Sequence, residues 1–104
     1  MPCEGIGQAM TKRQVGDSLK SLPQWALGED GKSIERRMVF KNFVQAVEAI
    51  NHIKDIAEFQ GHHPDLHLTS YKNLRVVLYT HALGGVTQND FIVAFHIDQQ
   101  YKTG

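Results

Sequence analysis

The sequence predicts an α+β domain in which a four-stranded antiparallel sheet has three helices packed on one face (α-β-β-α-β-β-α). The main observation is an alternation along the chain: segments of helical periodicity are separated by pairs of short segments in which apolar and polar residues alternate. The second is size, because 104 residues suffice for a single domain, residues 1–104, and are too few for two. Hydrophobic residues make up 41% of the chain and charged residues 21%, which argues against a disordered tail or a fibrous repeat.

The first helix is predicted from a capping box, in which Thr11 and Gln14 satisfy free N–H groups at the start of the helix. The helix should end before Pro23, which cannot continue it. We expect the preceding residues 1–10 to be loose.

Two strands are expected next, at residues 25–27 and 34–40. The Asp30-Gly31 pair between them is a strong hairpin signal, because the turn needs a positive φ that glycine adopts easily. Apolar residues alternate along the second strand, and Arg36 falls on their face.

The longest helix is predicted between Asn42 and Gly61. Asn42 and Gln45 form a capping pair, and Gly61 suits the left-handed conformation that ends many helices. The apolar residues that recur at helical spacing are Phe43, Val47, Ile50, Ile53 and Ala57.

A second pair of strands is expected at residues 66–71 and 74–80, with the turn between them near Lys72-Asn73. The pair Gly84-Gly85 then interrupts the alternating pattern.

The final helix is expected from about residue 88 to residue 101, with Thr87 and Asp90 in another capping box. Residues 91–95 are all apolar and point all round this helix. Since so small a domain has no internal partner for the outer side, we expect that side to pack against another subunit.

The balance of charge argues against nucleic acid as a direct partner. Eleven basic residues match eleven acidic ones, whereas duplex-binding proteins usually carry a basic excess. The single cysteine, Cys3, cannot form an internal disulfide, which suits a reducing compartment. No apolar stretch is long enough for a membrane span or a signal peptide, so we expect a cytoplasmic protein without a membrane partner, with the nucleus as a further location.

Three histidines stand at positions typical of functional residues. His62 and His63 follow the longest helix, and Pro64 stiffens the chain after them. His81 lies at the end of a strand, before a Gly-Gly pair. Because imidazole changes its charge nearest neutral pH, these residues are candidates for acid–base chemistry.

Other interpretations of the same residues stay open. His62 and His63 are explained equally well by hydrogen bonds within a loop. A zinc site of His62, His63, His67 and His81 is a further alternative, although Pro64 interrupts the spacing between two of these ligands.

Four more polar residues are expected to be structural. His52 suits a solvated surface position, His96 suits a core or interface position, and Asp90 suits a helix cap. Glu58 is expected to be a surface carboxylate unless it faces the histidine loop.

The residues together resemble the pterin-4a-carbinolamine dehydratase family, over a stretch from about Trp25 to Ile97. The His-His-Pro motif alone would be weak. Its combination with Thr-His some 17 residues later and with the Gly-Gly and Asp residues that follow is specific. The resemblance rests on Trp25, Phe40, Phe43, Ala57-Glu58, His62-His63-Pro64-Asp65, Tyr71, Thr80-His81, Gly84-Gly85 and Asp90.

The resemblance implies an enzyme whose substrate is a small-molecule pterin. Family members remove water from 4a-hydroxytetrahydropterin to give quinonoid dihydropterin, in the regeneration of tetrahydrobiopterin, and need neither a metal nor an organic cofactor. The resemblance also implies a homodimer or homotetramer, for which we expect contacts through the C-terminal helix and a sheet edge. The alternative function is that of a protein-interaction module, because some relatives act as dimerisation partners of a homeodomain transcription factor.

The family's motif implies that His62, His63 and His81 are the catalytic residues. His63 would be the acid–base residue nearest the departing hydroxyl, His62 and His81 would share proton removal and orientation, and Glu58 would set a histidine's tautomer. The chain departs from some relatives at Gly61, where they carry an acidic residue, and the stretch from His63 to His81 is one residue longer than in vertebrate members. The substrate-binding residues implied are Glu58, Gly61, His62, His63, Pro64, Tyr79, Thr80, His81 and Ala82.

Overall fold

The computed structural model describes residues 9–101, and the order of elements predicted from the sequence is confirmed. One short element was not predicted, a 3₁₀ helix between the last strand and the last helix. The elements are α1 (Lys12–Leu19), β1 (Ala26–Leu27), β2 (Ile34–Val39), α2 (Phe43–Gln60), β3 (Asp65–Thr69), β4 (Asn73–Leu78), the 3₁₀ helix η1 (His81–Leu83) and α3 (Gln88–Gln100).

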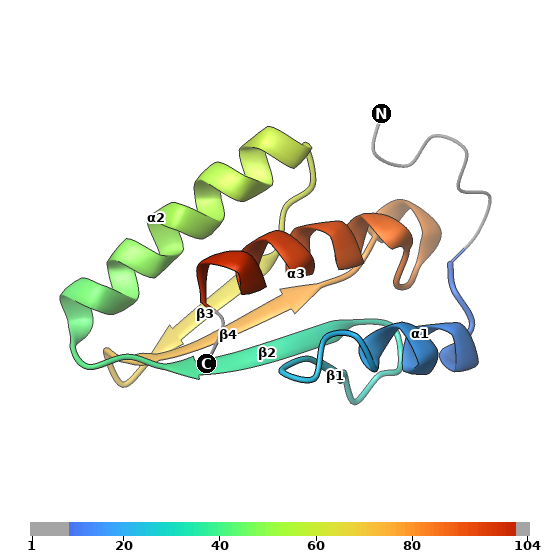
Figure 1. Ribbon diagram of the computed structural model, residues 1–104, viewed down its shortest axis with the longest axis horizontal. Coiled ribbons are helices and arrows are strands. Elements are labelled where there is room, and N and C mark those ends of the chain that lie inside the picture. Colours follow the sequence, from blue (N-terminus) through green and yellow to red (C-terminus); the bar gives the residue numbers. More distant parts are fainter. Residues whose placement is uncertain (1–8, 102–104) are drawn as a thin grey trace.

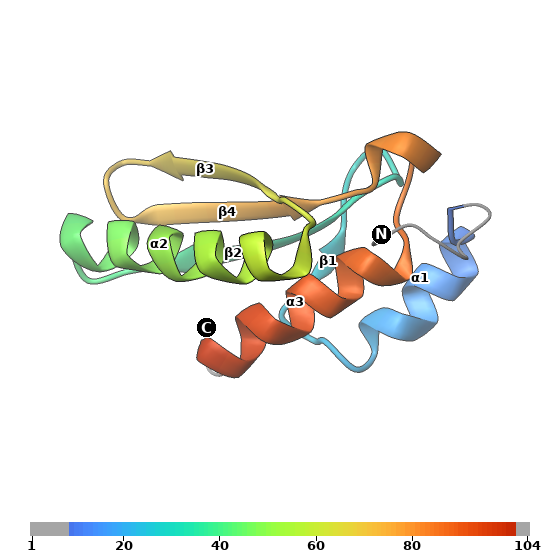
Figure 2. The same cartoon turned by 90° about the horizontal axis from the view of Figure 1, so that it is seen from above.

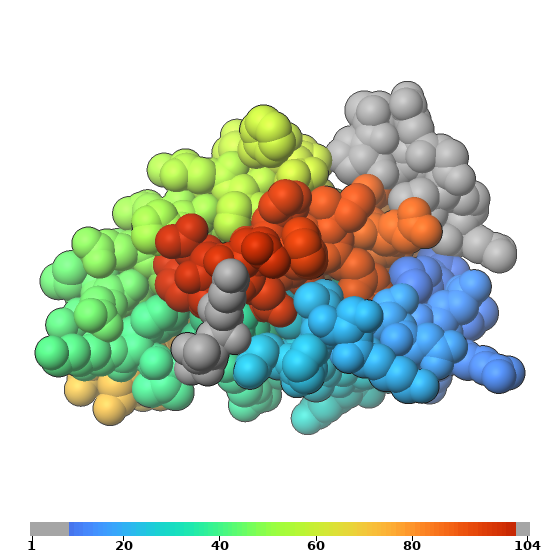
Figure 3. Space-filling model, viewed as in Figure 1, coloured from blue at the N-terminus to red at the C-terminus, as the bar shows by residue number. Residues whose placement is uncertain are grey.

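The four strands form one sheet in the order β1-β2-β4-β3, and every neighbouring pair is antiparallel. All three helices lie on one side of the strands (Figures 1 and 2). The space-filling view shows α1, α2 and α3 side by side across this face (Figure 3). The fold class predicted from the sequence is therefore confirmed, and the opposite face of the sheet carries no helix within residues 9–101.

The core lies between the sheet and the helices. Ile34 of β2 and Leu78 of β4 lie opposite one another in the sheet, and both are fully buried. Ile53 of α2 and Val93 of α3 are fully buried as well. Burying side chains of this size contributes about 1.5–3 kcal/mol each, so this layer supplies most of the stability of the fold.

The predicted helix caps are confirmed. Thr11 and Thr87 both form complete capping boxes, with Gln14 and with Asp90 respectively. Asn42 caps α2, and Gly61 ends it in the left-handed conformation, with φ of 65°. These caps hold the end of α2 and the start of α3 in fixed positions, which matters for the site described below.

The turn between β3 and β4 was placed two residues too late in the sequence analysis. Ser70 and Tyr71 form it, with φ values of 48° and 55°, and Asn73 already belongs to β4. A hydrogen bond from the Lys72 N–H to the Ser70 carbonyl (2.7 Å) tightens the turn. Turns with positive φ are usually recognised by a glycine or asparagine. Ser70 and Tyr71 are neither, so the sequence did not mark the position of this turn.

The buried side of α2 also differs from the expected stripe. Phe43 is 54% exposed, although the spacing placed it in the core. Ala46 and Ala49 are fully buried instead, because small side chains let α2 approach the sheet closely. The bulky residue at the start of the helix therefore points outward.

A buried ion pair joins the sheet to the last helix. Arg36, on the apolar face of β2 as predicted, has a completely buried side chain, and its Nη1 lies 2.5 Å from Oδ1 of Asp98 in α3. The same oxygen accepts a hydrogen bond from the indole N–H of Trp25 at 2.9 Å. Asp98 thus ties the segment before β1, the strand β2 and the helix α3 together.

The residues before α1 are described from Ala9 onward. Met10 donates its backbone N–H to the Val86 carbonyl (2.8 Å), and its side chain packs against the core. Cys3 and the rest of residues 1–8, part of the segment expected to be loose, lie outside the described residues. Within residues 9–101, no helix combines the length and the apolar character needed to cross a membrane.

Candidate active site

A small pocket forms where the C-terminal end of α2 meets the segment after β4. Gly61 reverses the chain at the end of α2 and sends the next residues toward β3, and η1 turns the chain back after β4. The pocket has a volume of about 260 Å³ and is lined by Gly61, His62, His63, Tyr79, Thr80, His81 and Ala82. The three histidines predicted to be catalytic therefore border one pocket, although they come from two separate segments of the chain.

His62 rests on a buried carboxylate. Its Nε2 lies 2.5 Å from Oδ1 of Asp90, and the side chains of the two residues are only 11% and 0% exposed. A short contact of this kind, shielded from water, is stronger and better defined than one at the surface. The imidazole of His62 is therefore held in a fixed orientation.

Asp90 is itself fixed by the start of α3. Its Oδ2 accepts hydrogen bonds from the Thr87 backbone N–H (2.9 Å) and from the Thr80 hydroxyl (3.1 Å). Since the Thr80 hydroxyl donates to Asp90, the Thr87 hydroxyl donates to Thr80, across 2.8 Å. The carboxylate thus completes the capping box of α3 with one oxygen and presents the other to His62.

His63 contacts the second carboxylate of the site. Its Nε2 lies 2.6 Å from Oε2 of Glu58, which stands in the last turn of α2. This pair is exposed, with side chains 63% and 70% accessible to solvent. Water screens an exposed pair, so Glu58 orients His63 less firmly than Asp90 orients His62.

The two carboxylates determine in the same way which ring nitrogen of His62 and of His63 carries the proton. An ionised carboxylate only accepts hydrogen bonds, so in each pair the histidine donates through Nε2–H. A neutral His62 or His63 then carries its lone pair on Nδ1, which is the atom left to accept or return a proton. The tautomer expected to be set by Glu58 is thus supported for His63 by a direct contact.

Among the residues that the structure describes, 9–101, the contact found for the His81 ring is with an aromatic neighbour and not with a carboxylate. His81 begins η1, beyond the last residue of β4, where the sequence analysis had placed the end of a strand. Its ring lies against the ring of Tyr79, with 4.2 Å between centroids and 44° between planes. The Tyr79 side chain therefore forms one wall of the pocket beside His81.

Most of the residues expected to bind substrate line the pocket, but some positions of the sequence signature lie elsewhere. Pro64 is outside the lining, and Glu58 reaches the site through His63. Tyr71 sits in the turn between β3 and β4, and Trp25 is buried against Asp98. Neither of these two residues lines the pocket.

The four histidines suggested for zinc are not gathered together. His67 is exposed on β3 and borders a different hollow, on the open face of the sheet. Within residues 9–101, no three side chains of His, Cys, Asp or Glu are placed to share a metal ion. Among the other histidines, His52 contacts the Tyr101 hydroxyl at 2.7 Å, and His96 is exposed on α3.

Asp90 is the residue whose place in the site the sequence analysis missed. It was expected to cap α3, which it does, but it also contacts His62 across 28 positions of the chain. The capping-box pattern explained the residue completely, so no local signal pointed to a second contact.

A larger hollow, about 670 Å³, lies between α1 and α3 and is lined mainly by apolar side chains such as Phe91 and Phe95. It contains none of the histidines that are paired with carboxylates. We locate the chemistry at the smaller pocket because acid–base catalysis needs oriented proton donors and acceptors more than it needs volume.

Comparison with known proteins identifies the relatives of this chain. The family model described as pterin 4 alpha carbinolamine dehydratase matches residues 8–100. The chain is 37% identical over 102 residues to pterin-4-alpha-carbinolamine dehydratase 2, mitochondrial, of Arabidopsis thaliana, covering 95% of this chain and 54% of that protein. It thus spans about half the length of that relative. A protein of Legionella pneumophila (strain Corby), named as a candidate pterin-4-alpha-carbinolamine dehydratase, is 44% identical over 98 residues, covering 93% of this chain and 86% of that protein.

Among solved structures, a transcriptional coactivator/pterin dehydratase from Brucella melitensis superposes with a TM-score of 0.82 at 27% sequence identity, covering 88% of this chain and 97% of that one.

Proposed function

Because the chain belongs to the pterin-4a-carbinolamine dehydratase family, we propose that it is a hydro-lyase that converts 4a-hydroxytetrahydropterin to quinonoid dihydropterin and water. The observation that carries the proposal is the pairing of two adjacent histidines with two different carboxylates at one pocket. His62 contacts Asp90 and His63 contacts Glu58, and His81 borders the same pocket.

The reaction requires two proton transfers on neighbouring atoms of the substrate. The hydroxyl on C4a is a poor leaving group, so it must gain a proton as the C4a–O bond breaks and water departs. The hydrogen on N5 must leave as a proton, so that its bonding electrons form the C4a=N5 double bond. One group must therefore donate a proton while another accepts one, each step contributing about 10² to 10⁴ in rate.

The histidines of the pocket suit these opposite roles. We assign His63 as the acid that protonates the hydroxyl, since its exposed ring exchanges protons readily with solvent. His62 and His81 share the removal of the N5 proton and the orientation of the carbinolamine. After each turnover one histidine has gained a proton and the other has lost one, and exchange with water restores both.

Binding of the flat pterin ring is assigned to the walls of the pocket. The Tyr79 ring offers a face for stacking, and the backbone of residues 79–82 offers groups for the amide-like edge of the pterin. The pocket volume of about 260 Å³ is slightly below the range typical of small-molecule sites, so we expect part of the bound pterin to stay open to water.

The proposal extends to the setting of the enzyme. We place it in the regeneration of tetrahydrobiopterin, in the cytoplasm, and as a homodimer or homotetramer. Large apolar side chains on the outer sides of α2 and α3 support an oligomer, since burial in a subunit contact would remove them from water. These exposed residues are Phe43, Val44, Phe59, Ile92 and Phe95.

The same exposed residues favour a second candidate function, a protein-interaction module that binds another helical protein. The Brucella melitensis relative is described as a transcriptional coactivator as well as a dehydratase. Size-exclusion light scattering separates the two: a stable homo-oligomer supports subunit packing, whereas exchange of subunits with an added helical partner supports the module.

The enzyme proposal is tested by stopped-flow absorbance on freshly generated 4a-hydroxytetrahydropterin. The wild type should exceed the spontaneous rate of dehydration, and His63→Ala should lower the enzymatic rate at least about tenfold. His67→Ala is the matched control, because this exposed histidine lies on β3 outside the pocket and should leave the rate unchanged. A wild-type rate equal to the spontaneous one would exclude the dehydratase activity.

A further inference from the structure

Three neighbouring strands place basic side chains side by side on the open face of the sheet. Arg37 of β2 is opposite Arg75 of β4, and Arg75 is also opposite His67 of β3. Residues directly opposite on one face have their Cβ atoms about 4.5–5.5 Å apart. The two arginines and the histidine therefore form one row across the sheet, which we call the basic row.

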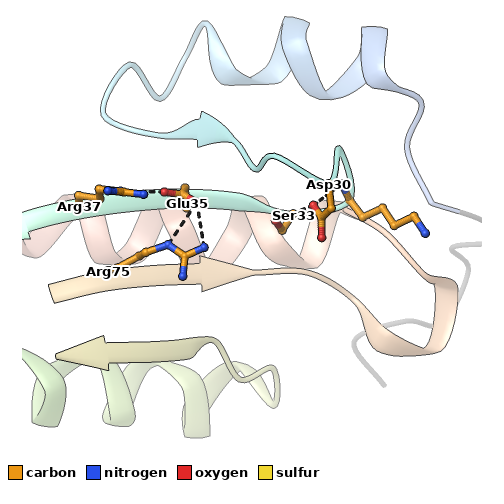
Figure 4. Close-up of polar contacts among 6 residues, drawn as sticks. Asp30, Ser33, Glu35, Arg37 and Arg75 are labelled. Atoms are coloured by element: carbon orange, nitrogen blue, oxygen red, sulfur yellow. Dashed lines mark hydrogen bonds and ion pairs between the residues drawn. The ribbon is translucent and has the colours of Figure 1, made fainter. Parts of the chain in front are cut away.

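The basic row is unfavourable for folding by itself, because like charges opposite one another destabilise a sheet. Glu35 partly offsets this cost: its Oε1 accepts from Nη2 of Arg75 at 3.2 Å, and its Oε2 accepts from Nε of Arg37 at 3.0 Å (Figure 4). The hydrogen bond from Arg75, followed by that from Arg37, holds the pKa of Glu35 below its ordinary value. One carboxylate charge against two guanidinium charges leaves the row with a net positive charge.

Glu35 also holds the two guanidinium groups in place while leaving donors unused. Among the side-chain contacts within residues 9–101, Arg37 uses only Nε, and Arg75 uses Nε and Nη2. The side chain of Arg37 is 74% exposed, so its remaining N–H groups are open to a ligand. Because the groups are already positioned, they lose less conformational freedom when they bind an anion.

A hollow of about 460 Å³ lies over the basic row. Its lining also includes Thr69, two residues after His67 on β3, and Asn73, which lies opposite Thr69 and two residues before Arg75 on β4. A hydroxyl and an amide thus stand beside the two guanidinium groups and the imidazole. This set of donors is rich in N–H and O–H groups, and the volume falls in the range of small-molecule sites.

From this arrangement we propose that the basic row binds the phosphate group of a small molecule. Guanidinium groups match phosphate oxygens with paired hydrogen bonds, and charge strengthens each bond. Nucleic acid is the less suitable ligand, because the chain as a whole has a formal net charge of zero. Arg75 lies in β4 and Tyr79 directly follows this strand, four residues later, which is about 13 Å at the rise of a strand, so this site is separate from the histidine pocket.

The test is an amide-detected NMR titration of the full-length protein at constant ionic strength. The probes are inorganic phosphate, adenosine 5′-monophosphate, and adenosine as the uncharged control. We expect saturable shifts of β2, β3 and β4 amides with both phosphate-bearing probes and none with adenosine. Tighter binding of the nucleotide would identify phosphate esters as the ligand class, whereas equal affinity would identify free phosphate, and both results support the site.

Variants locate the binding and exclude a general effect of charge. Arg37→Gln and Arg75→Gln should each weaken phosphate binding at least about tenfold, because each removes charge-assisted hydrogen bonds. Arg13→Gln, at an exposed position of α1, removes the same charge elsewhere and should leave the affinity unchanged. Melting curves check that Arg75→Gln is folded, and the exposed Arg37 supplies a second variant in any case. Absence of saturable shifts, shifts of the same residues by adenosine, or equal weakening by Arg13→Gln would overturn the proposal.

Discussion

The carboxylate of Asp90 lies against the imidazole of His62, with 2.5 Å between Oδ1 and Nε2 and with Asp90 completely buried. The other oxygen of Asp90 caps α3 by accepting the Thr87 N–H. The position of the His62 ring is therefore coupled to the start of a helix, and a residue that stabilises the fold also prepares the site for proton transfer.

Asp90→Asn should lower the rate of dehydration about 10- to 100-fold. An amide offers one acceptor oxygen, so it cannot serve both His62 and the Thr87 N–H, and a hydrogen bond to a charged group is worth about 1.5–3 kcal/mol. Steady-state kinetics should show the loss mainly in kcat. Asp55→Asn, an exposed carboxylate on α2, is the control and should be without effect.

Loss of the cap complicates the Asp90 variant, because removal of an N-terminal cap costs about 0.5–2 kcal/mol of stability. Rates must therefore be measured below the thermal transition of the variant. Full activity of folded Asp90→Asn would contradict the positioning role of Asp90.

Removal of the Tyr79 ring should raise KM and leave a smaller effect on kcat. An aromatic contact contributes about 0.5–1.5 kcal/mol, so Tyr79→Ala should raise KM about 2- to 12-fold, while Tyr79→Phe keeps the ring and stays near wild type. The centroids of the Tyr79 and His81 rings are 4.2 Å apart. The NMR signals of the His81 ring protons should therefore shift in Tyr79→Ala and not in Tyr79→Phe. An unchanged KM together with unchanged His81 resonances in Tyr79→Ala would contradict the assignment of the Tyr79 ring to the substrate pocket.

Asp98→Ala should destabilise the protein by about 3–5 kcal/mol, because it leaves the charge of Arg36 buried without its partner. Trp25 loses a hydrogen-bond acceptor in the same variant. Urea unfolding measures the difference. Asp17→Ala, whose carboxylate is 3.6 Å from the exposed Lys20, should change stability by no more than about 0.5 kcal/mol. A comparable small loss in both variants would show that burial adds nothing to the Arg36–Asp98 pair.

Acid should remove the stability contributed by Glu35. The hydrogen bond from Arg75 is the main cause that lowers the pKa of Glu35 in the folded protein. The contribution is therefore complete above the unfolded pKa, about 4.3, and is lost as the pH falls through the lower folded pKa. A carbon-detected NMR titration should show the pKa of Glu35 rising toward its ordinary value in Arg75→Gln. An unchanged titration curve in that variant would contradict the assignment.

Local signals were sufficient for the starts of α1 and α3 and for the end of α2. Capping boxes at Thr11 and Thr87 and the glycine at 61 act within a few residues, so the sequence alone predicted them correctly. The turn at Ser70 and Tyr71 was misplaced because neither residue type marks a positive φ.

Contacts between distant residues were beyond sequence reasoning. The histidines were found from their positions at the ends of predicted elements and from the family motif. Their partners depend on how the segments pack: Asp90 of α3 reaches His62 after the end of α2, and Asp98 neutralises an arginine of β2. No spacing in the sequence encodes these distances, since β3 and β4 lie between the partners in both cases.

The most direct test of the account is the single-turnover rate of dehydration for His62→Ala, His63→Ala and His81→Ala beside the wild type. Each replacement should slow the reaction at least about tenfold, and combining all three should return it to the spontaneous rate, because the residues act as one unit. Wild-type rates in the folded triple variant would contradict histidine acid–base catalysis at this pocket.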